Sequence, residues 1–232
     1  MIGAAVRAVI NPVRRLYGRV AIGAGQFNRA TPLSREYGYD RGTPIDRYYI
    51  EQFLAAHADD IRGRVLEIGD DTYSRRFGGE RIAHQDILHL AGNPKATITG
   101  DISDPATLPS ASFDCVILTQ TLHLIYDMTA AMCELRRSLA RGGVLLITVP
   151  GVSSIDRGEW GGDWHWSLTE LSMGRLLQQA FEPAQVSVQA FGNLFAATAF
   201  LHGACVEEVD RSKLDRIDDA YPVTVAARAR AD

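Results

Sequence analysis

Short β-branched runs alternate with amphipathic helical patterns along this chain, and this alternation constrains its fold more than any other feature. The runs that predict strands cover residues 64–68, 81–87, 96–100, 113–119 and 142–150. Helical periodicity covers residues 44–61, 127–141 and 167–181. Strands separated by helices pair in parallel through right-handed crossovers, which place helices on both faces of the sheet. The pattern therefore predicts an α/β fold with a parallel sheet.

The helix ends and the last strands refine this prediction. Gly142 and Gly143 provide a stop for the second helix, and Ser167 with Glu170 three residues later has capping-box spacing for the third. Two further alternating runs, at 184–192 and 221–229, follow each other without a simple strand-helix rhythm. Such a pair is typical of antiparallel strands at the edge of a sheet.

The stretch "GRVLEIGDD", which begins at residue 63, has the form of a strand that enters a tight ligand-binding turn. Glu67 and Gly69 follow the apolar run, and Asp86 lies 19 residues beyond Glu67, near the end of the next predicted strand. An acid at that distance can accept hydrogen bonds from a ribose diol, so the spacing indicates a nucleoside cofactor. No glycine occurs between Gly69 and Gly78, so the dinucleotide pattern G-x-G-x-x-G is absent. This disfavours a nicotinamide or flavin dinucleotide.

Several stretches, in order, resemble the motifs of the class I S-adenosylmethionine-dependent methyltransferases, and in particular the type 11 methyltransferase-domain proteins. "VLEIGDD" is similar to the first motif, a strand followed by an acid and a glycine turn. "GDISDPATLPSASFDCVILTQTLHLIYD" resembles the acid after the third strand and the fourth strand with its loop, and "LRRSLARGGVLLITVPG" resembles the helix and fifth strand that follow. The resemblance covers residues 44–190. It implies a Rossmann-like, doubly wound sheet of seven strands, mostly parallel with an antiparallel C-terminal strand, with helices on both faces.

The resemblance also implies S-adenosylmethionine as the cofactor and a position for each matching residue. Glu67 and Gly69 are expected beside the methionine part and ribose, and Asp86 at the ribose hydroxyls. Asp101 and Ile102 are expected to flank the adenine. Each of these acids could instead be a capping or solvated residue at a strand end.

Two other pairs complete the expected cofactor site. Thr119 and Gln120 would line the loop under the sulfonium, or merely cap the next element. Arg47 and Tyr48 precede the first strand, where Arg47 could bind the cofactor carboxylate in a bidentate manner or remain an exposed helix residue.

The chain departs from the family pattern at Asp71 and Tyr73, where glycine is usual. An aspartate can also make a tight turn, so the departure does not exclude binding. Either these side chains contact the cofactor or they turn away from it. The alternative function is therefore a binding or structural relative that keeps the fold and has lost cofactor affinity.

Methyl transfer is an in-line displacement, which needs a base only if the acceptor loses a proton. The candidate catalytic residues are His123, in the loop after the fourth strand, and Asp163 and His165 in "EWGGDWHWS". Candidate substrate-binding residues in the same glycine-rich stretch are Trp160, Trp164 and Trp166. Aromatic faces there could shape a pocket for a small-molecule or saccharide acceptor, or could pack against the N-terminal segment as a lid.

Charge divides the chain into two predicted parts. Residues 1–35 contain six arginines and no acid, whereas the remaining 18 basic residues face 28 acidic ones. We expect a basic N-terminal arm or lid over residues 1–43 and a catalytic domain over residues 44–232. The arm could pack on the acidic body or touch a membrane surface. The acidic body disfavours binding to nucleic acid.

Composition narrows the setting of the protein. No apolar run approaches the roughly 20 residues that a membrane-spanning helix needs. Three cysteines without a CxxC spacing favour a reducing, cytoplasmic location. No cluster of ligand residues has metal-binding spacing, so we expect no metal.

Overall fold

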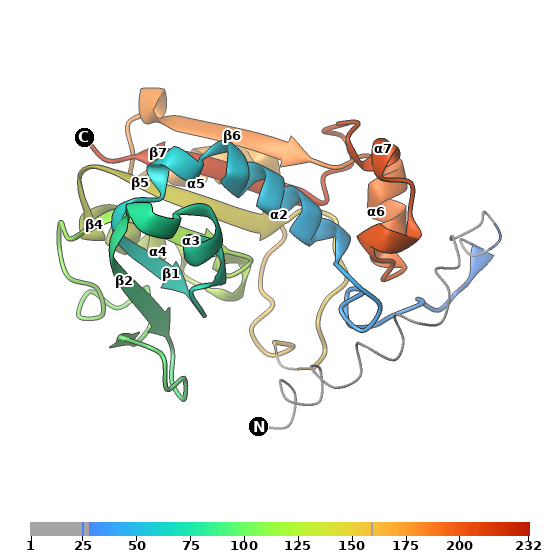
Figure 1. Ribbon diagram of the computed structural model, residues 1–232, viewed down its shortest axis with the longest axis horizontal. Helices are drawn as coiled ribbons and strands as arrows, with labels where there is room; N and C mark the ends of the chain where they lie inside the picture. The colour runs from blue at the N-terminus through green and yellow to red at the C-terminus, as the bar shows by residue number, and fades with distance from the viewer. Residues whose placement is uncertain (1–24, 26–27, 159) are drawn as a thin grey trace. The chain divides into compact units, whose positions relative to one another are not determined.

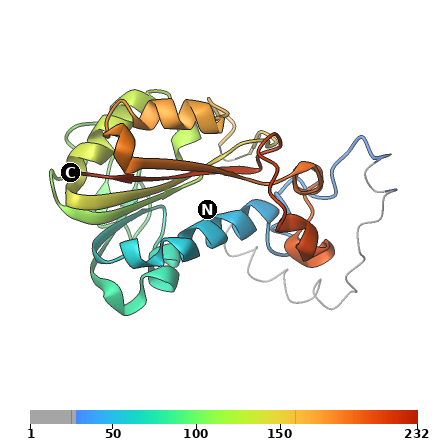
Figure 2. The ribbon, with the colours of Figure 1, turned by 90° about the horizontal axis from the view of Figure 1, so that it is seen from above.

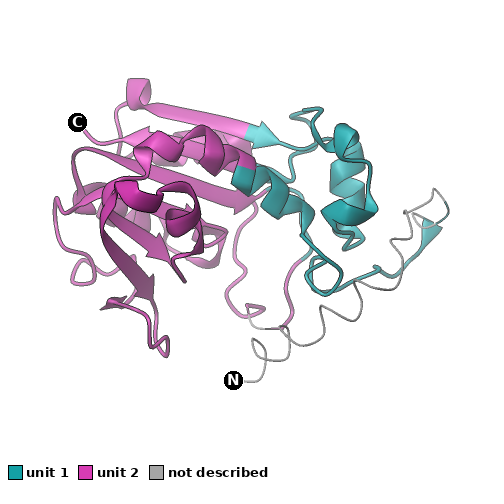
Figure 3. Cartoon of the chain, in the orientation of Figure 1, with its two compact units in different colours: residues 1–51, 151–154, 190–224 teal, residues 52–150, 155–189, 225–232 magenta. Residues whose placement is uncertain are grey.

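The computed structural model describes residues 25, 28–158 and 160–232. These residues form two compact units (Figure 3). Unit 1 comprises the described residues up to Glu51 together with Gly151–Ser154 and Ala190–Thr224. Unit 2 comprises Gln52–Pro150, Ile155–Gln189 and Val225–Asp232. Most of the expected basic arm lies outside the described residues, so the arm and the boundary at residue 43 remain predictions.

The secondary structure follows the predicted alternation (Figure 1). The strands are β1 (Gly63–Ile68), β2 (Ile82–His89), β3 (Ile98–Thr99), β4 (Phe113–Thr119), β5 (Leu139–Pro150), β6 (Val186–Phe191) and β7 (Thr224–Arg230). The α-helices are α2 (Ile45–Ala56), α3 (Thr72–Phe77), α4 (Met128–Ser138), α5 (Glu170–Leu177), α6 (Leu194–Leu201) and α7 (Arg211–Leu214). Short 3₁₀ turns include η2 (Ala58–Asp60), η3 (Gly79–Arg81) and η4 (Leu122–Leu124). No helix among the described residues is long and apolar enough to cross a membrane.

The strands form one seven-stranded sheet in the order β3-β2-β1-β4-β5-β7-β6. The strands from β1 to β5 pair in parallel. β7 runs against β5, because Gly143 bonds to Ala231 near the start of β5 whereas Gly151, just after its end, bonds to Val223. The predicted sheet, mostly parallel with an antiparallel C-terminal strand, is confirmed.

The central strands are buried because helices cover both faces of the sheet. α4 and α5 lie on one face and α3 lies on the other (Figure 2). Val116 and Ile117 of β4 are fully buried, and their side chains point to opposite faces because a strand alternates. Met132 of α4 and Met173 of α5 belong to the same buried cluster as Val116. Unbroken apolar runs such as 115–118 are typical of parallel strands covered on both sides.

The predicted ends of three elements were wrong. β2 continues to His89, because Ile87 and Leu88 are buried and still pair with β1. α4 ends at Ser138, not at the glycines, and β5 begins at once. Gly142 lies inside β5 with a φ of +79°, close to a shift in the β4–β5 register, so it serves a bulge rather than a helix stop.

The cap of α5 also differs from the prediction. Thr169, not Ser167, is the N-cap residue, and its hydroxyl accepts the backbone N–H of Ser172 at 3.2 Å. Ser172 completes a capping box in which its own hydroxyl accepts the backbone N–H of Thr169 at 2.9 Å. The spacing rule had selected the wrong hydroxyl because several polar residues precede this helix.

Candidate active site

The candidate site lies where β1, β2, β4 and β5 of unit 2 reach their carboxyl ends (Figure 1). In open sheets of this kind, ligands bind outside the carboxyl ends of the strands. Most of the residues selected from the sequence lie in the loops that follow these strands. Their contacts decide which of them could meet a ligand.

Glu67, next to the last residue of β1, ties the strand to the first turn of α3. Its carboxylate accepts the backbone N–H groups of Tyr73 at 3.1 Å and Ser74 at 2.7 Å. The side chain is 1% exposed, and this burial raises its pKa to about 7 although the hydrogen bonds from Ser74 and Tyr73 oppose the change. Glu67 therefore fixes the geometry of the turn and can exchange a proton near neutral pH.

Gly69 leaves open space at the same turn. Its φ is +94°, a conformation that favours glycine, and a Cβ built there would meet no atom within 4 Å. The backbone is held from both sides, because Gly69 N–H donates to Leu88 at 2.9 Å and Gly69 C=O accepts the Asn93 amide at 2.8 Å. A rigid backbone with free space beside it is suited to close approach by a ligand.

The residues that replace the expected glycines are engaged within α3 and its cap. Asp70 accepts the backbone N–H of Thr72 at 2.9 Å and so closes the turn. Asp71 forms an ion pair with Arg75, one helical turn later. Tyr73 is 6% exposed, and its ring stacks on Phe77 with centroids 6.3 Å apart. The turn is thus made by aspartates and an early helix instead of by further glycines.

Asp86 lies in the middle of β2, not at its end. Its carboxylate accepts hydrogen bonds from Arg64 at 2.7 Å and from the Thr97 hydroxyl at 2.8 Å. Burial raises the pKa of Asp86, but the hydrogen bonds from Arg64 and Thr97 together with the charges of Arg64 and His84 lower it below its usual value. The end of β2, three residues or about 10 Å further along, is occupied by His89. The sequence prediction missed His89 because it ended the strand too early.

Asp101 and Ile102 follow the short strand β3. The Asp101 carboxylate is exposed and accepts the backbone N–H of Ser103 at 2.8 Å and its hydroxyl at 2.7 Å. Ile102 is 5% exposed and belongs to the hydrophobic core. Asp101 thus caps a turn, and Ile102 anchors that turn in the hydrophobic core.

Of the six buried side-chain polar atoms that make no hydrogen bond within the described residues, three lie near the ends of β4 and β5. Among the described residues, Gln120 Nε2, His123 Nδ1 and Thr148 Oγ1 are buried and make no hydrogen bond. Gln120 also has a φ of +47°, and its backbone N–H donates to the Thr148 carbonyl at 2.8 Å, which places the two residues together. Thr119, the last residue of β4, pairs with Thr148 in the sheet. Unsatisfied buried groups and a strained backbone are typical of binding and catalytic sites.

Thr148 was not selected from the sequence. It stands in the apolar run "VLLITVP", where threonine is a common strand residue. In the sequence, the only sign that Thr148 belongs to the site is its position near the end of the strand that became β5.

His123 is buried in η4, the turn that follows β4. The side chain is 3% exposed, and burial lowers its pKa to about 4. The imidazole is therefore neutral at pH 7. The ring of Trp164 packs edge-on against it with centroids 4.4 Å apart.

The tryptophan loop packs on η4 and its neighbours. The His123 carbonyl accepts the backbone N–H groups of His165 and Trp166, each at 3.2 Å. The Trp166 indole donates to the Ile125 carbonyl at 3.1 Å. The sequence prediction missed Tyr126. Its ring centroid lies 5.4 Å from that of His165 and 5.8 Å from that of Trp166. We call His123, Tyr126, Trp164, His165 and Trp166 the aromatic cluster.

The outer part of this loop is open to solvent. Tyr126 is 73% exposed, and Trp160 and Trp166 are 36% and 37% exposed. Asp163 is exposed, and its backbone N–H donates to the Trp160 carbonyl at 3.0 Å. Exposed aromatic rings above a buried histidine offer a surface for a ligand with apolar faces.

Arg47 and Tyr48 belong to unit 1 and have partners there. Arg47 donates to the Tyr39 hydroxyl at 3.0 Å, and its guanidinium lies over the Tyr39 ring. The Tyr48 hydroxyl is hydrogen-bonded to Asp215. Their expected contact with the cofactor remains a prediction.

Comparison with known proteins agrees with this architecture. The methyltransferase-domain family model matches residues 72–147. No curated protein matches the chain. A methyltransferase of Archaeoglobus fulgidus described as dependent on S-adenosylmethionine has a TM-score of 0.54 at 13% identity, over 79% of this chain and 94% of that one.

Two further solved structures have the same fold. The N-methyltransferase NodS of Bradyrhizobium japonicum, solved with S-adenosylhomocysteine, gives a TM-score of 0.52 at 15% identity, over 89% of this chain and 95% of that one. A methyltransferase of Thermotoga maritima, described as a possible histamine N-methyltransferase, gives 0.51 at 16% identity, over 81% and 94% of the two chains.

Proposed function

We propose that the chain binds S-adenosylmethionine and transfers the methyl group of this cofactor to a small-molecule or saccharide acceptor at the carboxyl ends of β1, β4 and β5. The match to the methyltransferase-domain model over residues 72–147 and the fold shared with solved methyltransferases support this proposal. The observation that supports this most is the group of unpartnered buried atoms on Gln120, His123 and Thr148. Leaving each of them unsatisfied costs about 1–3 kcal/mol, a cost that a bound ligand can remove.

The first turn fits the cofactor. Gly69 leaves room for close approach, and Glu67 offers a buried carboxylate beside the start of α3. Asp101 and Ile102 would stay on the adenine side, and Thr119 would line the cofactor site next to Gln120. When bound, the cofactor supplies an electrophilic methyl group. The residues of the chain need only orient the acceptor, exclude water and accept or hold a proton.

The aromatic cluster and Trp160 are suited to hold the acceptor. Aromatic faces pack against the apolar faces of sugar rings and of small aliphatic molecules. The neutral His123 can donate or accept a hydrogen bond from an acceptor hydroxyl beside Trp164. Because its pKa is about 4, His123 suits positioning better than proton removal at neutral pH. Exposed His165 and Asp163 remain the candidate bases.

A second candidate function is a relative of these enzymes that has lost cofactor affinity. Two observations favour it. His89, not an acid, ends β2, while Asp86 is occupied by Arg64 and Thr97. Asp71 is paired with Arg75 and is not free to contact the cofactor without breaking that pair. The carboxylate expected to hold the ribose hydroxyls would then be missing, and cofactor binding would be weaker.

Calorimetric titration with S-adenosylhomocysteine and S-adenosylmethionine separates the two candidates. We expect binding in the micromolar range or tighter for the enzyme, and no heat for the relative that lost affinity. The test variant is Gly69→Ala, with Gly79→Ala as its matched control. Both glycines have positive φ and open space around a Cβ, but Gly79 lies in η3, before the start of β2.

The two variants should lose similar stability, about 1–2 kcal/mol, because each forces alanine into a left-handed conformation. Only Gly69→Ala should lose affinity, by about tenfold or more, because its methyl group occupies ligand space. Equal affinities for the two variants would argue against a cofactor at this turn. Transfer of labelled methyl groups to a panel of sugars, amines and carboxylic acids then identifies the acceptor class.

A further inference from the structure

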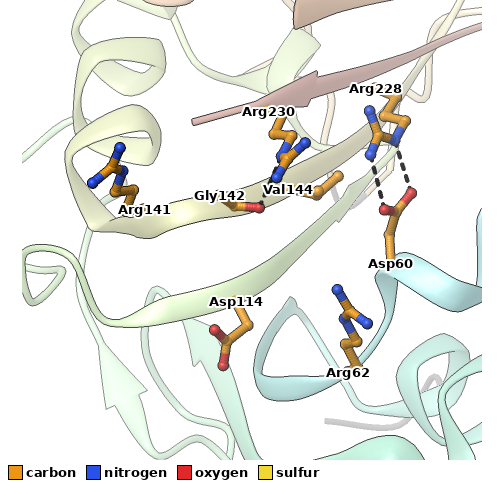
Figure 4. A pocket seen from close by; sticks show the side chains of 8 residues that line it. All are labelled: Asp60, Arg62, Asp114, Arg141, Gly142, Val144, Arg228 and Arg230. Atoms are coloured by element: carbon orange, nitrogen blue, oxygen red, sulfur yellow. Dashed lines mark hydrogen bonds and ion pairs between the residues drawn. The ribbon is translucent and has the colours of Figure 1, made fainter. Parts of the chain in front are cut away.

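A cavity lies at the edge of unit 2 that is opposite to the candidate active site. Its volume is about 340 Å³. The residues around it precede β1, begin β4 and β5, or end the antiparallel strand β7 (Figure 4). These are the amino-terminal ends of the parallel strands, whereas the candidate active site lies at their carboxyl ends. The two sites are therefore separate.

Arginines dominate the lining of this cavity. Arg62, Arg141, Arg228 and Arg230 contribute side chains, against two carboxylates from Asp60 and Asp114. Figure 4 shows Arg62 and Arg230 reaching toward the cavity from opposite sides. Apart from Gly142, Val144 is the one apolar residue in the lining of this cavity. An apolar ligand would find little to pack against here.

Only part of this positive charge is neutralised. Arg228 binds Asp60 through two parallel hydrogen bonds of 2.8 and 2.9 Å, so these two residues form a closed pair. Hydrogen bonds from Arg228 lower the pKa of Asp60, which keeps that carboxylate ionised. Within the described residues, the side chain of Arg230 makes a single long hydrogen bond of 3.4 Å, to the Gly142 carbonyl.

The two remaining arginines have no ion-pair partner in the described part of the chain. Arg62 and Arg141 are exposed, and neither donates a hydrogen bond to another described residue. Asp114 accepts the backbone N–H of Arg64 at 2.8 Å, which uses one of its oxygens for the β1–β4 register. Three guanidinium groups thus surround a cavity that holds one carboxylate outside the closed pair.

We propose that this cavity binds the phosphate group of a small ligand. Guanidinium groups donate paired hydrogen bonds that match the oxygens of a phosphate, and several of them converging from different strands would enclose it. The volume is near the lower end of small-ligand pockets, so a phosphate or a short phosphate ester fits and a large cofactor does not. The chain carries a net charge of −4, which disfavours extended nucleic acid as the occupant.

The test is calorimetric titration of the whole chain with inorganic phosphate and, separately, with glycerol phosphate, at constant ionic strength set with sodium chloride. Arg62→Ala and Arg141→Glu are the test variants, and both change exposed side chains without a structural partner. Arg175→Ala is the matched control, because it removes one positive charge from the exposed face of α5, outside the cavity. Titration with S-adenosylhomocysteine is run on the same proteins.

We expect phosphate binding to weaken about tenfold in Arg62→Ala and at least as much in Arg141→Glu, and to be unchanged in Arg175→Ala. Affinity for S-adenosylhomocysteine, whether present or absent in the wild type, should not change with any of the three. Tighter binding of glycerol phosphate would identify a phosphate ester as the ligand, and tighter binding of phosphate would identify the free anion. No binding of either probe to the wild type, or an equal loss in the control, would overturn the proposal.

Discussion

At the scale of single residues, burial decides the chemistry of the two groups that flank the candidate site. Glu67 and His123 both lie next to strand ends, where sequence reasoning expects polar residues that are free to act. Burial raises the pKa of Glu67 to about 7 and lowers that of His123 to about 4. Each group is therefore largely uncharged in weakly acidic solution, and each can meet a ligand as a hydrogen-bonding group more readily than as a fixed charge.

The residue-scale prediction concerns His123. His123→Phe removes a buried nitrogen that has no partner, and it removes no charge at pH 7 because the imidazole is neutral. We expect the free energy of unfolding to stay constant or rise by about 1 kcal/mol, while turnover with the acceptor identified by the screen falls at least tenfold. Urea unfolding and steady-state kinetics measure the two quantities.

Thr148→Val provides a second, nearly isosteric test of the same idea. It removes the unpartnered hydroxyl at the end of β5 and should also leave stability unchanged or slightly higher. If both variants lost stability and kept full turnover, the unpartnered atoms would have a structural role and the placement of the site would be wrong.

At the scale of elements, the sequence located every strand but misplaced several ends. The run 113–119 coincides with β4, since apolar and polar residues change sharply at both of its ends. β2 and α4 were misjudged because their ends are set by neighbours. Pairing with β1 up to Leu88 and with β3 at His89 extends β2, and the start of β5 stops α4 before its glycines. The end of β2 was placed two residues too early and that of α4 three residues too late. The error in β2 put Asp86 near the end of the strand and hid His89.

The element-scale prediction concerns the start of α5. Thr169→Ala removes the hydroxyl that caps the backbone N–H of Ser172, and we expect a loss of about 1 kcal/mol in the free energy of unfolding. Ser167→Ala is the matched control, because Ser167 is exposed and is not the cap residue, and it should change stability by less than about 0.5 kcal/mol. If urea unfolding showed a larger loss of stability in Ser167→Ala than in Thr169→Ala, Ser167 would be the cap residue, as the spacing first indicated.

At the scale of the whole molecule, the buried carboxyl group of Glu67 links global stability to pH. Its pKa in the folded protein is about 7, above the value of 4.5 expected for the unfolded chain. The folded state therefore holds a proton that the unfolded state has released between these two values. The stabilising contribution is complete below pH 4.5 and is lost as the pH rises through 7.

Glu67→Gln tests this linkage, since glutamine has the shape of the protonated side chain and cannot ionise. Between about pH 5 and pH 8, the wild type should lose on the order of 3 kcal/mol more unfolding free energy than the variant. Urea unfolding at both pH values measures the difference, and other titrating groups cancel because both proteins contain them. Parallel pH profiles would mean that Glu67 is ionised throughout, held by the N–H groups of Tyr73 and Ser74.

The sequence by itself determined the fold class of this protein, because the periods of apolar residues depend only on which elements must bury a face. The antiparallel last strand and the turn after Glu67 follow from such local patterns, whereas the order of the strands in the sheet was seen only in the structure. Only the tertiary structure decided which polar groups are left without partners. Asp86 is satisfied by Arg64 and Thr97, which come from other segments, whereas Thr148 is buried and unsatisfied in an ordinary strand run. The arginine-lined cavity has the same origin, since Arg62 and Arg230 are far apart in sequence and meet only because β7 returns antiparallel to the start of β5.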